Sequence, residues 1–161
     1  MHWGLVPSGM GDLGVAVDEA GICRVRFDGP KAPSATVVDP LLVRAIEQLS
    51  AYFAGELTEF DVPLSVSGGT EFDRAVWREL AAIPYAEMRT YGEIAAAVGD
   101  KSEARAVGVA CNRNPLPVIV PCHRVVGAGG KLVGFGGGLP RKRFLLELEA
   151  RVRVERDFRL V

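Results

Sequence analysis

The chain has 161 residues, of which 48% are hydrophobic, and a mean hydropathy of +0.17. This is enough for one domain of ordinary size or two small ones, and no apolar run is long enough to span a bilayer. The first residues lack the charged and apolar regions of a signal peptide, so we expect a cytoplasmic protein that does not bind membranes.

The formal net charge of −1 hides an asymmetry along the chain. Residues 1–68 carry 4 Lys and Arg against 9 Asp and Glu, whereas residues 69–161 carry 15 against 11. This pattern indicates that the second part meets any polyanionic partner. An unevenly charged surface that binds nothing is an equally good interpretation of the charges alone.

The three cysteines, Cys23, Cys111 and Cys122, do not form a disulfide framework, because their number is odd and their spacings are long. No Cys or His pair has the spacing of a zinc site, and no cofactor motif is present. We therefore expect neither a metal nor a cofactor.

The N-terminal part is predicted to be a small mixed domain. Residues 13–29 alternate around a turn and indicate a β-hairpin, and residues 40–55 have apolar side chains at helical spacing between a proline and a glycine. Residues 58–69 look like a last strand that ends in a Gly-Gly hinge. We place a domain boundary near residues 67–70.

Three helices are predicted after this boundary. The pairs Thr70–Asp73 and Thr90–Glu93 are capping boxes that open the first two helices, and Ser102 is a good N-cap for the third. The last two helices and the tight turn between them are typical of helix-turn-helix, although many helical domains contain such a pair without binding nucleic acid.

The segment PLPVIVPCHRV, residues 115–125, has three prolines in seven residues and is predicted to be extended. It is followed by a loop with seven glycines in residues 127–138. A helix then begins at residue 139, with Phe144, Leu145 and Leu148 predicted inward and residues 141–143 outward. Residues 151–161 indicate a short strand or a frayed end.

Cys122 is a candidate nucleophile, although a buried cysteine is more often a small core residue. A thiol becomes reactive where a base or a cation favours the thiolate. His123 is adjacent, but neighbouring side chains of an extended chain point to opposite sides. His123 would therefore need a bend or a bridging water to serve Cys122.

Residues 121–149, PCHRVVGAGGKLVGFGGGLPRKRFLLELE, closely resemble the active-site region of the O6-alkylguanine-DNA alkyltransferases, also called methylated-DNA–protein-cysteine methyltransferases. The similarity is close over about residues 45–150 and includes EFDRAVWRELAAIPYAEMRTYGEIAAAVG, ARAVGVACNRNP and LPVIVPCHRV. Over the first 40 residues it is loose. It implies an α/β (α+β) fold with two domains. Residues 1–68 would contain an antiparallel sheet, and residues 69–161 would be mainly helical with a winged-helix-like helix-turn-helix.

The resemblance implies DNA repair by direct transfer of a methyl or other alkyl group to the protein itself. The group leaves O6 of guanine, or O4 of thymine, and Cys122 accepts it irreversibly, once per molecule. His123 would act as a base through a bridging water, Glu149 would orient and charge that histidine, and Asn114 would fasten the thiol-bearing segment to the helix-turn-helix.

The implied partner is double-stranded DNA that contains O6-alkylguanine, bound through its minor groove. Tyr91 would help to rotate the nucleotide and hold the base, and Arg105 would fill the space that the flipped guanine leaves. Small side chains would let the third helix approach the DNA backbone: Ala104, Ala106 and Gly108. The resemblance implies a monomer that binds DNA singly or cooperatively.

Three residues in two segments depart from the family's pattern. Phe135 replaces a tyrosine of many members and keeps a wall for the base without the hydroxyl, while the adjacent Gly136 would offer its N–H to the substrate O6. Asn112 and Arg113 stand where small residues are common. The zinc-binding residues of some relatives are absent.

Three alternatives remain open beside the alkyltransferase. A silent sensor would bind alkylguanine and recruit other repair factors, but such proteins lack the acceptor cysteine. A helix-turn-helix regulator would need a sensor or dimerisation segment that the sequence does not show. A Cys-His hydrolase would turn over, and the flanking residues match no protease signature.

Overall fold

The structure is a computed structural model that describes residues 1–29 and 39–159. It divides into two compact units, Met1–Ser67 and Gly68–Val161. No helix in the described ranges is both long and apolar enough to cross a membrane. The predicted combination of an antiparallel sheet and a mainly helical part is confirmed.

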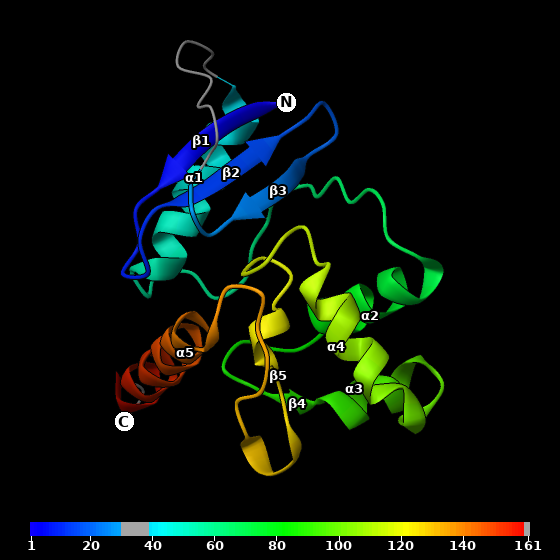
Figure 1. The fold of residues 1–161 in the computed structure, drawn as a ribbon. Coiled ribbons are helices and arrows are strands. Elements are labelled where there is room, and N and C mark those ends of the chain that lie inside the picture. The colour runs from blue at the N-terminus through cyan, green and yellow to red at the C-terminus, as the bar shows by residue number, and fades with distance from the viewer. Residues whose placement is uncertain (30–38, 160–161) are drawn as a thin grey trace. The chain divides into compact units, whose positions relative to one another are not determined.

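The N-terminal unit contains one three-stranded antiparallel sheet of β1 (His2–Val6), β2 (Leu13–Val17) and β3 (Ile22–Arg26), in that order (Figure 1). The predicted hairpin is β2–β3. The third strand is β1, so the prediction of a strand in residues 58–69 is wrong. That segment forms only an isolated bridge between Leu64 and Ile22. Pro63 lacks the N–H that a regular ladder requires at this position.

Helix α1 (Pro40–Phe53) covers one face of this sheet (Figure 1). Its N-cap is Asp39, whose carboxylate accepts a hydrogen bond from the Leu41 N–H at 2.9 Å. The sheet allows a close approach at Gly4, because a Cβ atom there would lie 2.7 Å from Cδ1 of Ile46. Apolar side chains at helical spacing fill this interface, as predicted: Leu42, Ala45, Leu49 and Tyr52.

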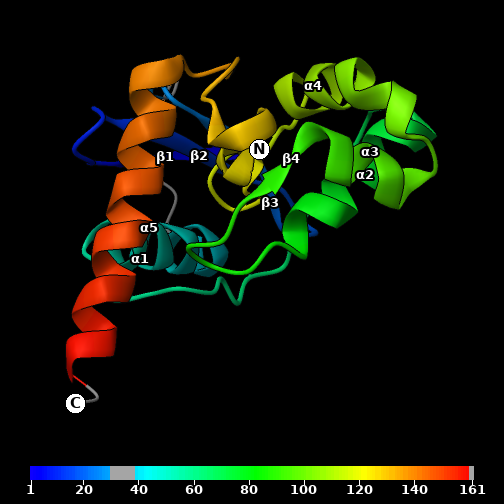
Figure 2. The same ribbon diagram turned by 90° about the horizontal axis from the view of Figure 1, so that it is seen from below.

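The C-terminal unit begins with α2 (Glu71–Ala81), α3 (Tyr91–Val98) and α4 (Ala104–Asn112), which pack on one another (Figure 2). Both predicted capping boxes are confirmed. Ser102, however, is not the N-cap of α4. A 3-10 turn, η1 (Lys101–Glu103), comes first, and the Asp100 carboxylate accepts from the Ser102 N–H at 2.8 Å. The Asp100 cap therefore begins the helical turn at Lys101, two residues before the start that a Ser102 cap would give, and α4 follows directly.

A short parallel pairing connects the helical part to the cysteine segment. Strand β4 (Arg89–Thr90) pairs with β5 (Val125–Val126), with Arg89 opposite Val125. Because β4 runs directly into α3 and β5 directly follows Cys122–Arg124, the pairing places the start of α3 beside the cysteine turn.

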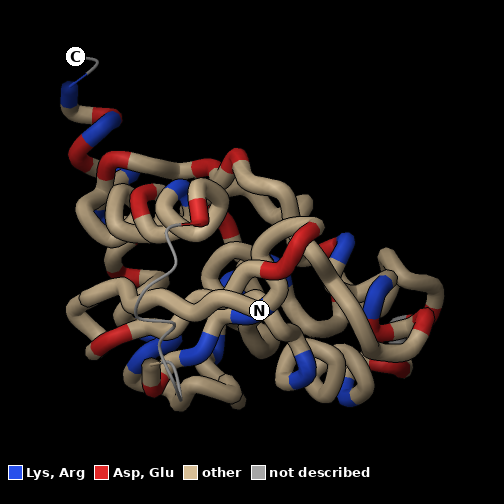
Figure 3. The backbone as a smooth tube through the Cα atoms, turned by 90° about the horizontal axis from the view of Figure 1, so that it is seen from above, with Lys and Arg blue, Asp and Glu red and all other residues tan. Residues whose placement is uncertain are grey.

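Helix α5 (Leu139–Arg159) has 21 residues, so the prediction of a strand or frayed end after residue 150 is wrong. Its buried positions Leu145, Leu148 and Val152 continue the helical spacing, and after Pro140 in the first turn no Gly or Pro follows. Basic and acidic residues alternate along its last turns (Figure 3). These charged residues lie on the exposed side of the helix. Over a short stretch of sequence, their alternation resembles the period of two that is typical of a strand.

Candidate active site

Cys122 lies in a tight turn, η2 (Cys122–Arg124), and its side chain is 5% exposed. The Cys122 N–H donates to the Val120 carbonyl at 2.8 Å, and the Arg124 N–H donates to the Pro121 carbonyl at 3.0 Å. The prediction of an extended segment is therefore wrong at the cysteine and also over residues 115–120, which form bends and turns. The turn is a bend of the kind that His123 would need in order to serve its neighbour's thiol.

Asn114 holds the segment that leads to the turn. Its Nδ2 donates to the Val120 carbonyl at 2.8 Å, and its Oδ1 accepts from the Leu116 N–H at 2.9 Å. Between them, the buried Val118 has a φ of 76°, which is strained for a β-branched residue. Burial raises the pKa of the Cys122 thiol, and a hydrogen bond from Asn114 opposes that rise.

His123 is fully buried, and its Nε2 lies 2.7 Å from Oε2 of Glu149 in α5. An ionised carboxylate only accepts hydrogen bonds, so Nε2 carries the proton and Nδ1 has a free lone pair. Nδ1 forms no hydrogen bond with the described residues. Burial lowers the pKa of His123 more than Glu149 raises it, which leaves a neutral imidazole suited to accept a proton.

Arg124 holds the same carboxylate from the other side. Its Nε donates to Oε1 of Glu149 at 2.8 Å and its Nη2 to Oε2 at 3.0 Å. Burial would raise the pKa of Glu149, but the hydrogen bonds and charges of His123 and Arg124 outweigh it and hold that pKa well below its usual range. Glu149 therefore stays ionised.

The loop before β4 completes this arrangement. The Ala86 N–H donates to Oε1 of Glu149 at 3.0 Å, and Ala86 has a φ of 61°. Arg124 also donates through Nη1 to the Ile83 carbonyl at 2.7 Å and lies 5.5 Å from the centre of the Tyr85 ring. The backbone of this loop thus orients the carboxylate that orients His123.

Tyr91, the first residue of α3, connects that helix to the glycine-rich loop. Its hydroxyl donates to the Val133 carbonyl at 3.0 Å. A Cβ atom at Gly108 in α4 would lie 3.9 Å from the Tyr91 ring, and one at Gly136 would lie 3.7 Å from Oδ1 of Asn112. These are ordinary contact distances, so α4 lies next to both the tyrosine and the loop.

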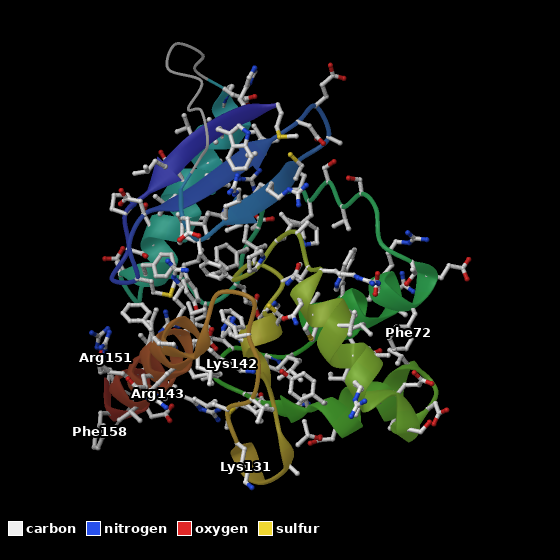
Figure 4. All side chains as sticks on the ribbon, viewed as in Figure 1. Phe72, Lys131, Lys142, Arg143, Arg151 and Phe158 are labelled. Carbon is white, nitrogen blue, oxygen red and sulfur yellow. The ribbon has the colours of Figure 1, made fainter. Side chains whose placement is uncertain are left out.

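Lys142 is predicted outward, but the structure buries it completely in the first turns of α5 (Figure 4). Its Nζ donates to the Tyr91 hydroxyl at 3.3 Å and to the Gly134 carbonyl at 3.2 Å. It also lies 5.5 Å and 6.0 Å from the ring centres of Tyr91 and Phe135. Burial lowers the pKa of Lys142, and the nearby Cys122 opposes that change.

Helix α4 presents a different kind of surface. Its buried face consists of Val107, Ala110 and Cys111, and the Ala110 carbonyl accepts from Nε1 of Trp77 at 2.8 Å. Arg105 is exposed and forms no ion pair within the described ranges. The predicted small residues are partly exposed around it: Ala104, Ala106 and Gly108.

Two family models together match almost the whole chain. The DNA-binding domain of 6-O-methylguanine DNA methyltransferase matches residues 71–151, and the ribonuclease-like domain of the same protein matches residues 1–66. The chain belongs to the 6-O-methylguanine DNA methyltransferase family. Membership makes it a DNA-binding enzyme, and it confirms the resemblance stated from the sequence.

Individual members of the family agree with this assignment. The methylated-DNA–protein-cysteine methyltransferase of Mycobacterium bovis is 50% identical over 153 residues, which are 92% of each chain. The enzyme of the same name from Methanosarcina acetivorans is 50% identical over 92% of this chain and 98% of its own. The crystal structure of Mycobacterium tuberculosis OGT in complex with DNA has a TM-score of 0.83 and 47% identity over 94% of each chain.

The structure brings the predicted methyltransferase residues into two connected groups. Hydrogen bonds link His123 to Glu149 and fasten Asn114 to the segment before Cys122, while Tyr91 joins the loop that carries Phe135 and Gly136. Arg105 lies apart from both groups, on the outside of α4. Their individual roles remain predictions.

Sequence reasoning missed two residues of this methyltransferase site, Arg124 and Lys142. The signal for Lys142 was its spacing, since it falls three residues before Leu145 and seven before Glu149, on the buried face of α5. The signal for Arg124 was its place beside His123. No group of three His, Cys, Asp or Glu in the described part could hold a metal ion.

Proposed function

We propose that this chain repairs DNA by accepting a methyl or other alkyl group from O6 of guanine on Cys122, once per molecule. The observation that carries the proposal is the buried Cys122 in one turn with His123, whose other nitrogen is hydrogen-bonded to the ionised Glu149. A nucleophile, an adjacent base and an orienting carboxylate form the arrangement that activates a thiol.

The proposed reaction balances with these groups alone. The thiol proton of Cys122 passes to Nδ1 of His123, directly or through a water. The sulfur then forms a bond to the methyl carbon as the bond from that carbon to O6 breaks. The electron pair stays on guanine, which takes up one proton and becomes the undamaged base. The thioether product has no good leaving group, so the step is irreversible.

The target atom lies inside the duplex, so the base must leave the stack at a cost of roughly a few kcal/mol. The exposed Arg105 would fill the gap, and the small residues around it would suit a close approach in the minor groove. Tyr91 and Phe135 would then contact the base. The proposed active form is a cytoplasmic monomer, which binds DNA singly or cooperatively.

The proposal is tested by the intact mass of the protein after mixing with a duplex oligonucleotide that contains one O6-methylguanine. We expect a gain of one CH2 unit per molecule, absent in the Cys122→Ala variant, which tests the acceptor directly. Tight binding of the damaged duplex without any mass gain would contradict methyl transfer. It would favour a sensor that recruits other repair factors, a function against which the presence of Cys122 argues.

A further inference from the structure

Asn112, the last residue of α4, has no structural task that explains its side chain. The side chain is exposed, and its amide forms no hydrogen bond with the described residues. A surface side chain without a partner contributes little to the free energy of unfolding. The fold therefore does not account for an asparagine at this position.

One face of α4 borders the candidate active site from Gly108 to Asn112. These two residues are four apart, so they share a face of the helix. A Cβ atom at Gly108 would lie 3.9 Å from the Tyr91 ring, and one at Gly136 would lie 3.7 Å from Oδ1 of Asn112. The side chain of Asn112 thus lies against the glycine-rich loop, one turn along the helix from the place where α4 meets the tyrosine.

The glycine-rich loop is held in place just before the residue that Asn112 meets. The Tyr91 hydroxyl donates to the Val133 carbonyl at 3.0 Å, and Nζ of Lys142 donates to the Gly134 carbonyl at 3.2 Å. These two anchors lie three and two residues before Gly136. The end of α4 and the loop are therefore fixed next to each other by the fold.

Arg113 follows Asn112 directly but has different surroundings. Its Nη1 donates to Oδ2 of Asp73 at 3.3 Å, and the same carboxylate oxygen accepts from the Thr70 N–H in the capping box of α2. Arg113 thus connects the end of α4 to the start of α2. Of these two neighbours, Asn112 is the one whose side chain meets the glycine-rich loop.

We infer that Asn112 is a specificity-determining residue, which limits the size of the alkyl group that Cys122 accepts. The inference rests on the proposed function. Gly136 is predicted to offer its N–H to the substrate O6, and the transferred carbon is bonded to that oxygen. A side chain against Gly136 therefore lies close to the transferred group. A methyl group needs little room there, whereas a benzyl group needs space that the asparagine fills.

The test compares two substrates in each protein, so that changes in DNA binding or thiol reactivity cancel in the ratio of the two rates. The full chain reacts with duplex oligonucleotides that carry either one O6-methylguanine or one O6-benzylguanine, and the intact mass is followed over time. The variants are Asn112→Gly and Asn112→Ala, which shorten the side chain. The matched control is Arg113→Ala, a truncation in the same turn at the residue that pairs with α2.

We expect the ratio of benzyl transfer to methyl transfer to rise about tenfold in Asn112→Gly and by less in Asn112→Ala, because a change of one small group in a pocket wall alters discrimination by that order. Arg113→Ala should keep the wild-type ratio. A merely structural effect of a substitution would change both rates together and leave the ratio as it is.

An unchanged ratio in a folded Asn112→Gly variant would overturn the inference, while methyl transfer by the wild type would still support the proposed function. Absence of any mass gain in the wild type with both duplexes would contradict the proposed function, and the inference would fail with it. If Asn112→Gly does not fold, as judged by circular dichroism, the ratio in Asn112→Ala decides.

Discussion

Arg124 and Lys142 are both buried cations of the C-terminal unit, but their surroundings are opposite. Arg124 meets Glu149 through two hydrogen bonds of 2.8 and 3.0 Å and also donates to the Ile83 carbonyl. Among the described residues, Lys142 donates to two neutral oxygens and lies beside two aromatic rings. Arg124 is matched by a permanent anion, whereas no described carboxylate forms an ion pair with Lys142.

This contrast separates a buried charge that an ion pair compensates from a buried charge that no described carboxylate compensates. A buried ion pair with satisfied hydrogen bonds holds its partners in one geometry, and removing one partner leaves an uncompensated charge. A buried cation without a permanent partner lowers stability in the resting state. Such local conflicts with stability are expected mainly at functional sites.

The largest expected effect comes from breaking the pair. Glu149→Gln leaves Arg124 and His123 without their carboxylate, and we expect the free energy of unfolding to fall by about 3–5 kcal/mol. Urea denaturation followed by circular dichroism measures the change, with the exposed Glu147→Gln on the same helix as the matched control. A loss below about 1 kcal/mol would show that the ion pair of Arg124 contributes little to the free energy of unfolding, so that the two cations do not differ in stability.

The second prediction has the opposite sign. Lys142→Met removes a buried charge without breaking an ion pair, so we expect the free energy of unfolding to stay the same or to rise by about 1–2 kcal/mol. The same urea experiment tests it. If the variant were destabilised as strongly as Glu149→Gln, Lys142 would belong with Arg124 among the charges that hold the fold.

Acid should weaken the ion pair between Arg124 and Glu149. The pKa of Glu149 is lowered in the folded state, so its contribution is fully present above the ordinary carboxyl range and is lost as the pH falls through and below it. The pKa of His123 is also lowered, and acid therefore favours the unfolded chain for the same reason. The stability difference between wild type and Glu149→Gln should shrink between pH 6 and pH 3.5. A constant difference over that range would contradict an ionised Glu149 with a lowered pKa.

The smallest effect on stability is expected at an exposed cation, which belongs to neither environment. Arg105→Ala should change the free energy of unfolding by less than about 0.5 kcal/mol, because Arg105 has no partner to lose in the described part of the chain. Methyl transfer from duplex DNA should slow about tenfold, equivalent to about 1.4 kcal/mol of the cost of base flipping.

The matched control for Arg105→Ala is Arg151→Ala on α5, and free O6-methylguanine serves as the substrate that needs no flipping. Equal slowing with the duplex and with the free base would place the role of Arg105 in the chemistry and not in the DNA.

Local residue patterns were sufficient to predict most of the elements. The hairpin of β2 and β3, the helix α1 and the capping boxes at Thr70 and Thr90 follow from side-chain periodicity and short-range hydrogen bonds. The errors arose where contacts distant in sequence decide. β1 completes the sheet in place of residues 58–69, and α5 packs through buried positions as far as Val152 before it continues to Arg159.

The sequence by itself determined the family and the identities of the candidate residues, because a run such as PCHRV contains the thiol and the imidazole whatever the fold around them. Only the tertiary structure decided how these residues meet. The carboxylate shared by His123 and Arg124 and the burial of Lys142 both depend on α5 packing against residues that lie far away in the chain. Burial and charge pairing are properties of the folded surroundings, and a lysine that looks solvated in the sequence becomes a buried cation through its neighbours in space.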